Sequence, residues 1–573
     1  MPNDIAANSS DEEHNISTEN NITPGGYYLH TRPEIIELVP ITARKLLDVG
    51  CGAGGLCVGL KKRQEITVEG VELVEQAAIH ARAHMDKVLN CTIDEALPNL
   101  LDDYYDCIVA ADVLEHVIDP WVTLTGLKNK LADDGKIVVS LPNVQNWEVV
   151  SNLLEGKWDY RNEGILDRTH LHFFTRKSVE ELFWNAGLHI THIGTTVHGP
   201  SLPNNLVDSL QTSGLVTGSL EQDAETFQFL VVAEKPKHLS SPSVAIIILN
   251  WNGKEDTLEC LSTVVLVEYP NYEIIVVDNG STDDSVDAIS KRYPAITILQ
   301  TGANLGYAGG NNFGIRWALD HGTDFIILLN NDTIVAQDLI IKFVDAYKLL
   351  PVDSVLGAKI YFYDKPDTIW FAGGKWNSQR SCFEHLGFGQ KDSAEFNNYF
   401  AVDYITGCAL FSSSATFRDV GLLDDNLFLT YEETDWCYRA QEKKHKCIFV
   451  PEAKLWHKVS SSFGGADSPL VAYFMQRNLL LWAKRHLSPQ ANERLRKTSF
   501  FTLRRILLPP LILQNKDINF VKRLLWSFIS WKNNIKRNLS DPMNQATLMA
   551  LRDYYFGRFG DCPPKVRLLN KNK

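Results

Sequence analysis

Short apolar runs recur along the first part of the chain, and stretches of mixed polarity long enough for helices separate them. Runs that are apolar at nearly every position are typical of strands buried on both faces, and their alternation with helices predicts a parallel sheet. Two further runs are expected to close the sheet as an antiparallel pair. The parallel candidates are Lys45–Val49, Thr67–Val71, Cys107–Ala111 and Lys136–Leu141, and the antiparallel pair is Leu188–Thr195 with Phe227–Ala233.

The same alternation begins again after a polar segment at residues 237–243, which contains proline and serine and reads as a linker. The pattern predicts an α/β protein of two domains, 26–236 and 244–486, preceded by a disordered leader at 1–25 and followed by a helical tail at 487–573. The strand candidates of the second domain are Val244–Leu249, Glu273–Val277, Thr297–Gln300 and Asp324–Leu329.

Charge is distributed unevenly along the chain. The whole chain carries −14, whereas residues 484–573 hold 19 Lys/Arg against 5 Asp/Glu. An acidic body argues against nucleic acid as a partner. In the tail, apolar residues recur at helical spacing between Val521 and Ile535 with basic residues between them. Such a helix suits an anionic membrane surface, and packing on the second domain with its charges in water is an equal alternative.

Cysteine use and hydropathy bear on location. The ten cysteines are scattered without a Cys-x-x-Cys pair, and no apolar run approaches the roughly 18 residues of a spanning helix. No basic segment followed by an apolar stretch marks the N-terminus. We therefore expect a cytoplasmic protein, peripheral at the inner face of the cell membrane if the tail binds lipid.

The first candidate site follows the strand Lys45–Val49. Asp48 ends this strand, three glycines (Gly50, Gly52 and Gly54) form the turn after it, and Glu72 ends the next strand. A glycine-rich turn with an acid after the second strand is typical of sites that bind a nucleoside-like ligand. On these residues alone a dehydrogenase also fits, and close packing without a ligand explains such turns as well.

The segment YDCIVAADVLEHV at 105–117 adds to this pattern, and together these motifs resemble class I S-adenosylmethionine-dependent methyltransferases over residues 26–236. The resemblance implies a Rossmann-like sheet with S-adenosylmethionine as cofactor. It also implies the cofactor-binding residues, which are Asp48, Gly50, Gly52, Gly54, Glu72, Asp94 and Asp112.

Methyl transfer to a hydroxyl needs an aligned nucleophile and a group that takes its proton. His170, in the segment RTHLHFFT at 168–175, resembles a residue on the acceptor side of these enzymes and is the candidate base. His116 follows the fourth strand and His172 shares the segment of His170. For all three histidines, helix capping or packing with a hydrogen bond is the alternative.

Five motifs in a fixed order carry the second candidate site: LNWNG at 249–253, VDNGS at 277–281, NLGYAGGNN at 304–312, LNNDT at 329–333 and YEETDW at 431–436. Together they resemble inverting glycosyltransferases of family 2, of the rhamnosyltransferase-like branch. The resemblance implies the GT-A fold and a nucleotide-sugar donor. The donor-binding residues that it implies are Asn250, Asp278, Asn304, Asn311, Asn331 and Asp332.

A departing nucleoside diphosphate develops negative charge that a divalent cation offsets. The resemblance makes Asp332 the anchor for Mg or Mn, although Asn330 replaces the first acid of the usual Asp-x-Asp pattern. His457, in WHKVS at 456–460, is the second candidate ligand, with a structural role as its alternative.

Inversion at the sugar carbon requires one base that deprotonates the acceptor. The second acid of Glu432-Glu433 matches the base of similar enzymes, so Glu433 is the candidate, with Glu432 or Asp435 as alternatives. Asp435 also stands one helical turn before Arg439, which is the spacing of a surface ion pair.

These observations predict a bifunctional enzyme of surface polysaccharide biosynthesis. It adds a sugar to a glycan acceptor, expected to be lipid-linked, and methylates a glycan hydroxyl. One alternative is a glycosyltransferase whose first domain is a non-catalytic methyltransferase-like scaffold. The other alternative is a non-enzymatic assembly platform.

Overall fold

The computed structural model of this chain describes residues 31–203, 205–212, 220–237, 240–459, 468–507 and 535–571. Its contacts divide the chain into two units, one running up to Val113 together with Asn129–Val138 and the other comprising Leu114–Lys128 and Val139–Lys573. The expected leader at 1–25, residues 238 and 239 of the linker and most of the tail segment 521–537 lie outside the described residues. The domain limits given by the sequence stay predictions.

A seven-stranded sheet has the order β3-β2-β1-β4-β5-β7-β6. The pairs β1 with β2 and β1 with β4 are parallel, whereas β6 and β7 are antiparallel, as the apolar pattern predicts. Its strands are β1 (Lys45–Val49), β2 (Thr67–Val71), β3 (Lys87–Leu89), β4 (Tyr105–Ala111), β5 (Leu131–Pro142), β6 (His189–Val197) and β7 (Thr226–Glu234). The helices along this part are α1 (Pro33–Leu38), α2 (Gly55–Arg63), α3 (Glu75–Ala81), α4 (Ile93–Ala96), α5 (Pro120–Lys130), α6 (Trp147–Leu154), α7 (Arg176–Asn185), α8 (Leu206–Thr212) and α9 (Leu220–Asp223).

Two of these strands differ from the expected pattern. β3 is only three residues long and none of them is fully buried, so it lacks the apolar run that marks the other strands. β5 begins at Leu131, five residues before the apolar run, because its first part includes the exposed Asp133 and Asp134. Exposed polar residues at a strand end give no apolar signal in the sequence.

A ten-stranded mixed sheet begins at Val244. Its main path runs β10-β9-β8-β11-β18-β13-β19-β12, with β14 beside β13 and β17 beside β19, and β15 pairs separately with β16. The strands are β8 (Val244–Asn250), β9 (Tyr272–Asp278), β10 (Thr297–Gln300), β11 (Phe325–Asn330), β12 (Thr333–Val335), β13 (Val355–Phe362), β14 (Lys365–Phe371), β15 (Gly374–Asn377), β16 (Cys382–His385), β17 (Phe400–Val402), β18 (Ala409–Ser413) and β19 (Cys447–His457).

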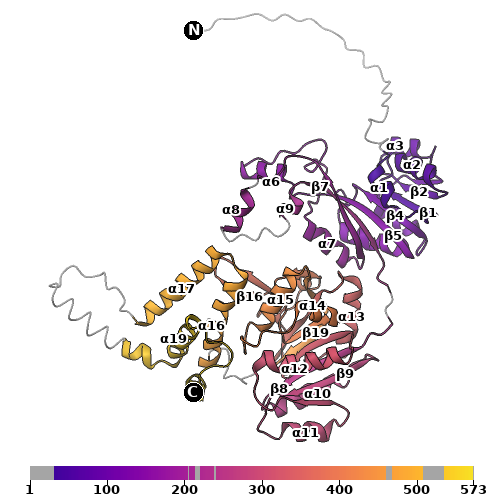
Figure 1. The fold of residues 1–573 in the computed structure, drawn as a ribbon. Helices are drawn as coiled ribbons and strands as arrows, with labels where there is room; N and C mark the ends of the chain where they lie inside the picture. The colour runs from indigo at the N-terminus through magenta and orange to yellow at the C-terminus, as the bar shows by residue number, and fades with distance from the viewer. Residues whose placement is uncertain are drawn as a thin grey trace, which may run out of the picture. The chain divides into compact units, whose positions relative to one another are not determined.

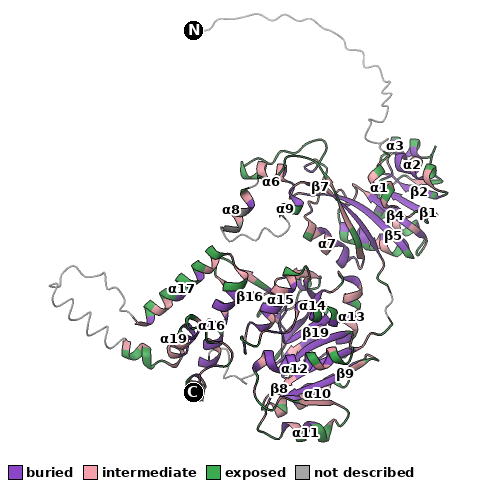
Figure 2. Cartoon of the chain, viewed as in Figure 1, coloured by how far each residue is buried: buried purple, intermediate pink, exposed green. Residues whose placement is uncertain are grey.

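Helices cover this sheet and bury its apolar strands. Helices α10, α12 and α13 pack against it (Figure 1), and Figure 2 shows β8, β9 and β19 as largely buried. Parallel strands covered on both faces need apolar residues at successive positions, which Val244–Ile248 supply. The helices are α10 (Lys254–Val264), α11 (Ser285–Arg292), α12 (Gly306–Asp320), α13 (Leu339–Leu349), α14 (Ser414–Val420) and α15 (Glu432–Glu442). Both sheets confirm the α/β class expected from the sequence.

The C-terminal part is helical, as expected. It contains α16 (Pro469–His486), α17 (Pro489–Leu507), α19 (Pro542–Tyr555) and α20 (Pro564–Lys571). Helix α16 packs against the other three helices. Apolar residues of α16 and α19 also form clusters with Leu427 and Phe428, which precede α15. Among the residues that the structure describes, no helix combines the length and the apolarity that a membrane crossing requires.

Candidate active sites

The first candidate site lies at the carboxyl ends of β1 and β2. Gly50, Gly52 and Gly54 follow β1 with φ angles of 72°, 53° and 85°, a region that side chains with a Cβ rarely adopt. This turn leads directly into α2. The Gly52 N–H donates to Glu72 Oε2 at 2.8 Å and the Val74 N–H donates to Glu72 Oε1 at 2.8 Å. The turn after β1 and the acid after β2 therefore meet, as the sequence predicts.

Two buried carboxylates interact electrostatically at this edge of the sheet. Asp48 is 3% exposed and Glu72 is 6% exposed. Burial raises the pKa of Asp48 to about 7, and the charge of Glu72 adds to the increase. Asp48 Oδ2 is buried without a hydrogen-bond partner among the described residues. A cationic ligand with N–H donors would relieve both conditions, and S-adenosylmethionine carries a sulfonium and an ammonium group.

The other predicted cofactor residues lie after β3 and β4. Asp112 follows β4 with φ of 56° and pairs with Arg32 at 2.5 Å, and Arg32 in turn lowers the pKa of Asp48 through its charge. Asp94 lies exposed in the first turn of α4, which a Thr92–Glu95 capping box starts. The charges of Glu72 and Arg32 thus both act on Asp48, and Arg32 also pairs with Asp112. Asp94 lies apart from them in sequence, in the helix after β3.

His170 lies in the segment between α6 and α7, where its ring contacts the ring of His116 with centroids 4.8 Å apart. Glu115 joins them: one ligand atom from each of the three residues lies within 4.8 Å of the others. The sequence singled out His170 but not Glu115. Only the cluster links Glu115 to chemistry, because nothing in its local sequence distinguishes a buried acid from a solvated one.

The second candidate site starts where β8 and β9 end side by side. Asn250 and Asp278 are register partners, and Asn250 Nδ2 donates to Asp278 Oδ1 at 3.0 Å. Thr257 Oγ1 donates to Asn250 Oδ1 at 2.8 Å and accepts from Asn331 Nδ2 at 2.9 Å. These contacts bring three of the predicted donor-binding residues, Asn250, Asp278 and Asn331, into one network at the carboxyl edge of the sheet.

Asn304 makes hydrogen bonds in the loop before α12, and Asn311 makes one within the helix itself. Asn304 Oδ1 accepts from the Gly306 N–H at 2.8 Å and from Asn279 Nδ2 at 3.3 Å. Asn311 is 1% exposed, and its Nδ2 donates to the Tyr307 carbonyl at 3.0 Å. In this structure Asn311 therefore stabilises α12, and Asn304 shapes the turn that starts it.

Asp332 lies in the turn between β11 and β12, and His457 ends β19, the strand that pairs with β12. Thr333 of β12 is the register partner of His457 in β19, and His457 Nε2 lies 3.1 Å from Asp332 Oδ1. Both side chains are less than one tenth exposed. A carboxylate oxygen and an imidazole nitrogen at this separation fit two ligands of one divalent cation, and Asn330, at the end of β11, adds no charge.

Glu432 and Glu433 begin α15 but differ in their surroundings. Glu432 is 1% exposed, whereas Glu433 is only partly buried. Burial and the charge of Glu433 raise the pKa of Glu432 well above its ordinary value, and the charge of Arg477 partly opposes this. Burial also raises the pKa of Glu433, with a backbone hydrogen bond from Gly407 acting against it. Glu433 is therefore the more accessible of the two acids.

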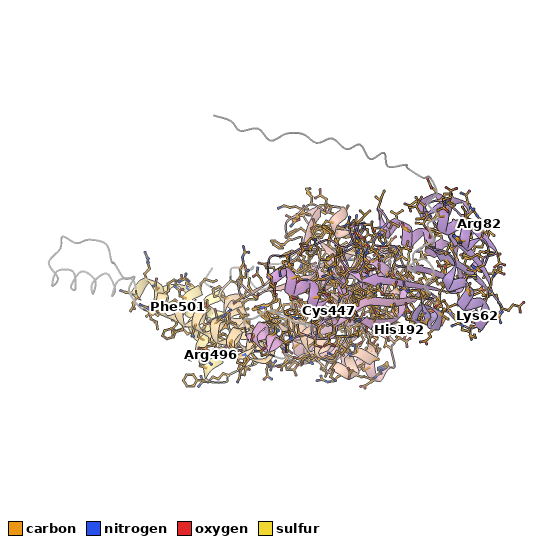
Figure 3. The ribbon with its side chains drawn as sticks, turned by 90° about the horizontal axis from the view of Figure 1, so that it is seen from above. Lys62, Arg82, His192, Cys447, Arg496 and Phe501 are labelled. Carbon is orange, nitrogen blue, oxygen red and sulfur yellow. The ribbon has the colours of Figure 1, made fainter. Side chains whose placement is uncertain are left out.

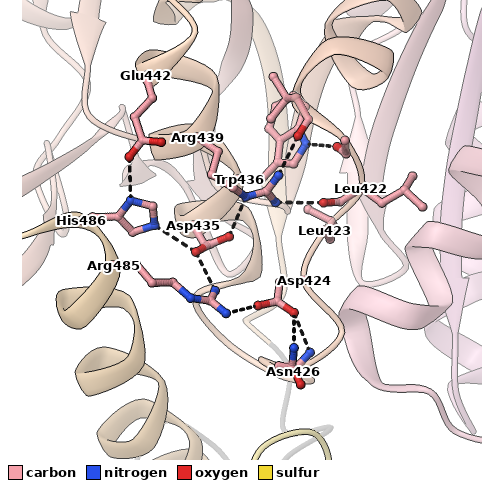
Figure 4. Close-up of polar contacts among 12 residues, drawn as sticks. Leu422, Leu423, Asp424, Asn426, Asp435, Trp436, Arg439, Glu442, Arg485 and His486 are labelled. Atoms are coloured by element: carbon pink, nitrogen blue, oxygen red, sulfur yellow. Dashed lines mark hydrogen bonds and ion pairs between the residues drawn. The ribbon is translucent and has the colours of Figure 1, made fainter.

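Asp435 belongs to an ion-pair network (Figure 4). It accepts from Arg439 Nε, Arg485 Nη1 and His486 Nε2, each at 2.9 Å. Burial by itself raises the pKa of Asp435, but the hydrogen bond from His486 and the charge of Arg439 outweigh it and lower this pKa to about 2. A carboxylate held by two guanidinium groups and an imidazole is a poor base, so Asp435 fits a structural role.

Tyr307 connects the predicted base with the predicted cation site. Its hydroxyl donates to the Gly407 carbonyl at 2.7 Å, and a Cβ at Gly407 would collide with the Tyr307 ring. Burial raises the pKa of Tyr307, and the charges of Glu433 and Asp332 add to this increase. The motif that contains Tyr307 assigns it no role, because this contact joins residues 100 positions apart.

Helix α16 holds the loop that leads to the predicted base. Phe428, Thr430 and Tyr431 have positive φ angles of 64°, 66° and 75°. Asn478 Nδ2 donates to the Leu427, Leu429 and Thr430 carbonyls at 2.8, 2.9 and 2.9 Å. A backbone with several residues in this sparsely populated region persists only when its surroundings fix it. The sequence does not mark Asn478, which has no recognisable motif around it.

Comparisons with known proteins match two different families to the two parts of the chain that contain the candidate sites. Residues 27–193 match the family model of a methyltransferase domain, and residues 245–416 match that of glycosyl transferase family 2. The low-salt glycan biosynthesis hexosyltransferase Agl10 of Haloferax volcanii is 28% identical over 205 residues, which are 35% of this chain and 62% of Agl10. The chain therefore spans less than two thirds of that relative.

Two rhamnosyltransferases are also similar to the chain. The dTDP-rhamnosyl transferase RfbF of Shigella flexneri is 25% identical over 253 residues, 43% of this chain and 81% of RfbF. The N-acetylglucosaminyl-diphospho-decaprenol L-rhamnosyltransferase of Mycobacterium tuberculosis is 25% identical over 246 residues, 39% of this chain and 79% of that protein.

Proposed function

Because the chain carries an N-terminal methyltransferase domain and a C-terminal family 2 glycosyltransferase domain, we propose that it is a bifunctional enzyme of surface polysaccharide biosynthesis. It transfers a sugar from a nucleotide-sugar donor to a glycan with inversion, and it methylates a glycan hydroxyl with S-adenosylmethionine. The observation that carries this proposal is the presence of two separate sets of buried acids at strand ends, Asp48 with Glu72 and Asp278 with Asp332.

The relatives support the glycan part of the proposal. Their names describe a hexosyltransferase of glycan biosynthesis, a transferase that uses a dTDP-sugar and a transferase whose acceptor is a decaprenol-linked sugar. We propose a nucleotide sugar as donor and a lipid-linked glycan as acceptor for this chain. Mass spectrometry of the products formed from such a glycan, a panel of nucleotide sugars and S-adenosylmethionine tests both transfers together.

In the sugar transfer, each part of the second site has a separate task. Asn250 and Asp278 hold the nucleoside end of the donor. Asp332 and His457 would hold Mg or Mn, which neutralises charge on the departing diphosphate. Glu433 takes the proton from the acceptor hydroxyl, whose oxygen then attacks the sugar carbon from the face opposite the leaving group.

In the methyl transfer, the first site binds the cofactor with Asp48, the glycine turn, Glu72, Asp94 and Asp112. S-adenosylmethionine supplies the methyl group when it is bound. The buried Asp48–Glu72 pair holds negative charge beside a cationic ligand, and the cluster of Glu115, His116 and His170 serves the acceptor hydroxyl. His170 is the base predicted from the sequence.

Replacing Glu72 with glutamine is expected to weaken S-adenosylmethionine binding about 10- to 100-fold. Hydrogen bonds to a charged group contribute roughly 1.5–3 kcal/mol, and each 1.4 kcal/mol corresponds to about tenfold in affinity. Calorimetric titration of the full chain with S-adenosylmethionine measures the change. Glu75→Gln is the matched control, because Glu75 is exposed in the first turn of α3. Equal affinities of Glu72→Gln and wild type would remove Glu72 from the site, and a wild-type chain that does not bind the cofactor would favour the scaffold alternative.

We propose that the protein is cytoplasmic and binds the inner face of the membrane through its basic tail. Helix α17 supports this: Phe500 and Phe501 are 62% and 61% exposed beside the exposed Arg496, Lys497 and Arg504. Arg496 and Phe501 are labelled in Figure 3. Exposed aromatics next to basic residues are typical of helices that lie in an anionic lipid interface.

The double variant Phe500→Ser/Phe501→Ser is expected to reduce co-sedimentation with vesicles rich in anionic lipid several-fold, because both rings would otherwise enter the interface. The matched control is Leu153→Ser/Leu154→Ser in α6, where two adjacent apolar residues are 55% and 75% exposed. Equal lipid binding by the α17 variant and wild type would refute membrane contact through this helix.

A further inference from the structure

Glu115, His116 and His170 form a ligand cluster outside the residues that the first site uses for its cofactor. One ligand atom of each lies within 4.8 Å of the other two, and Glu115 is 1% exposed. The cluster offers one carboxylate oxygen and two imidazole nitrogens. Two histidines and one carboxylate are a donor set that first-row divalent transition metals accept, and they leave further coordination positions open.

Hydrogen bonds fix which nitrogen of each ring holds the lone pair. His170 Nδ1 lies 2.9 Å from the Ile165 carbonyl, and His116 Nδ1 lies 3.2 Å from the Thr169 carbonyl. Because a carbonyl oxygen only accepts, each Nδ1 carries the hydrogen and each neutral ring has its lone pair on Nε2. A metal-binding histidine typically donates its other N–H to a carbonyl or carboxylate in this way.

Asp167 is linked to the His116 ring through the hydroxyl of Thr169. Thr169 Oγ1 donates to Asp167 Oδ1 at 2.6 Å and lies 3.1 Å from His116 Nδ1. Since the threonine hydrogen points to Asp167, Thr169 Oγ1 accepts from the Nδ1–H. This chain from carboxylate through hydroxyl to imidazole fixes the orientation of the His116 ring.

The backbone ties the two segments of the cluster together. The N–H groups of Leu171 and His172 both donate to the Glu115 carbonyl, at 2.8 and 3.2 Å. His172 Nε2 in turn lies 3.1 Å from the Ile118 carbonyl. These hydrogen bonds hold ligands from two chain segments in place, which lowers the cost of ordering them when an ion binds.

We propose that Glu115, His116 and His170 bind a divalent first-row transition-metal ion that holds the hydroxyl to be methylated. This inference rests on the proposed methyl transfer. It assigns His170 the role of a metal ligand instead of the role of a base. The ion lowers the pKa of the bound hydroxyl, whose proton passes to water. The oxygen then forms a C–O bond with the methyl carbon as the C–S bond of the cofactor breaks, and S-adenosylhomocysteine leaves.

The place of the cluster in the chain agrees with this role. Glu115 stands four positions after Ala111, the last residue of β4, and three positions after Asp112. In open α/β sheets, ligands bind beyond the carboxyl ends of the strands. The segment after β4 thus supplies a predicted cofactor residue and, directly afterwards, two of the three metal ligands.

Metal binding is tested with Co²⁺, whose visible absorption reports nitrogen and oxygen ligands, on the full chain carrying Asp332→Ala so that the second site does not contribute. We expect this protein to bind one equivalent, and the further changes His116→Ala or His170→Ala to weaken binding at least tenfold and to alter the spectrum. His172→Ala is the matched control, because it removes a neighbouring histidine outside the cluster. His116→Gln, with thermal unfolding compared among all variants, separates a lost ligand from a lost fold.

The proposal would be overturned if adding His116→Ala and His170→Ala together left the Co²⁺ affinity and spectrum of the Asp332→Ala protein unchanged. It would also be overturned if the Asp332→Ala protein lacked a one-equivalent Co²⁺ site. Methyl transfer at the full rate in excess chelator would overturn the metal role and leave the proposed function intact. A chain that binds Co²⁺ through the cluster but does not bind S-adenosylmethionine would instead contradict the proposed methyl transfer.

Discussion

Replacing Glu433 with glutamine is expected to lower the rate of sugar transfer by about 10²- to 10⁴-fold, which is the usual contribution of a general base. Glutamine has the same shape but cannot accept a proton from the acceptor hydroxyl. Donor binding is expected to stay within a few-fold of wild type, because Glu433 is assigned to the acceptor. Single-turnover transfer and donor titration on the same protein separate the two effects.

Two neighbouring acids serve as controls, because the sequence left them as alternatives. Glu432 is buried within range of the charge of Arg477, and Asp435 is held by Arg439, Arg485 and His486. We expect Glu432→Gln and Asp435→Asn to affect folding more than chemistry, with thermal unfolding reporting the difference. Normal turnover by Glu433→Gln, or its loss in Glu432→Gln at unchanged stability, would contradict the assignment.

The pH dependence of sugar transfer follows from the same carboxyl group. The base must be ionised, and burial raises the pKa of Glu433. Activity is therefore expected to fall, as pH is lowered, at a higher pH than the ordinary glutamate pKa of about 4.3 would give. Because Glu432 and Glu433 interact, the acid limb of the profile belongs to the pair.

Asp332→Asn is expected to reduce sugar transfer about 10³-fold and to abolish its dependence on Mg or Mn. A bound cation provides several kcal/mol of stabilisation to a developing charge, and each 1.4 kcal/mol corresponds to about tenfold in rate. The amide keeps the hydrogen-bonding shape next to His457 but removes the negative charge. Rates measured over a range of metal concentrations give both quantities.

The control for this prediction is Asp338→Asn, at the N-cap of α13 and only partly buried. His457→Ala is expected to raise the metal concentration needed for half-maximal activity, since His457 Nε2 lies 3.1 Å from Asp332. Unchanged metal dependence in Asp332→Asn would show that the cation, if one is used, binds elsewhere. Unchanged metal affinity in His457→Ala would leave His457 with the structural role alone.

The sequence predicts the strands that are buried on both faces and the residues that follow them. Lys45–Val49, Thr67–Val71 and Thr297–Gln300 become strands with the expected bounds. Because parallel strands end at one edge, Asp48 and Glu72 meet there, and so do Asn250 and Asp278. Local pattern and sheet geometry are sufficient for this part of the two candidate sites.

The sequence does not distinguish Glu432, Glu433 and Asp435, which follow one another in a single motif. Their pKa values depend on side chains of α16, since the charge of Arg477 acts on Glu432 while Arg485 and His486 bind Asp435. These partners are more than forty residues away and carry no motif. Their effect on each carboxylate depends on distance and burial, which exist only once the helices pack.

The sequence by itself determined the two α/β sheets, the order of the motifs and the two families that they resemble, because apolar periodicity and turn residues act over a few neighbouring positions. The tertiary structure decided which acids are buried, paired or open, how Asn478 holds the loop before Glu433, and that Glu115, His116 and His170 converge. Such convergence depends on long-range packing and leaves no local pattern in the sequence.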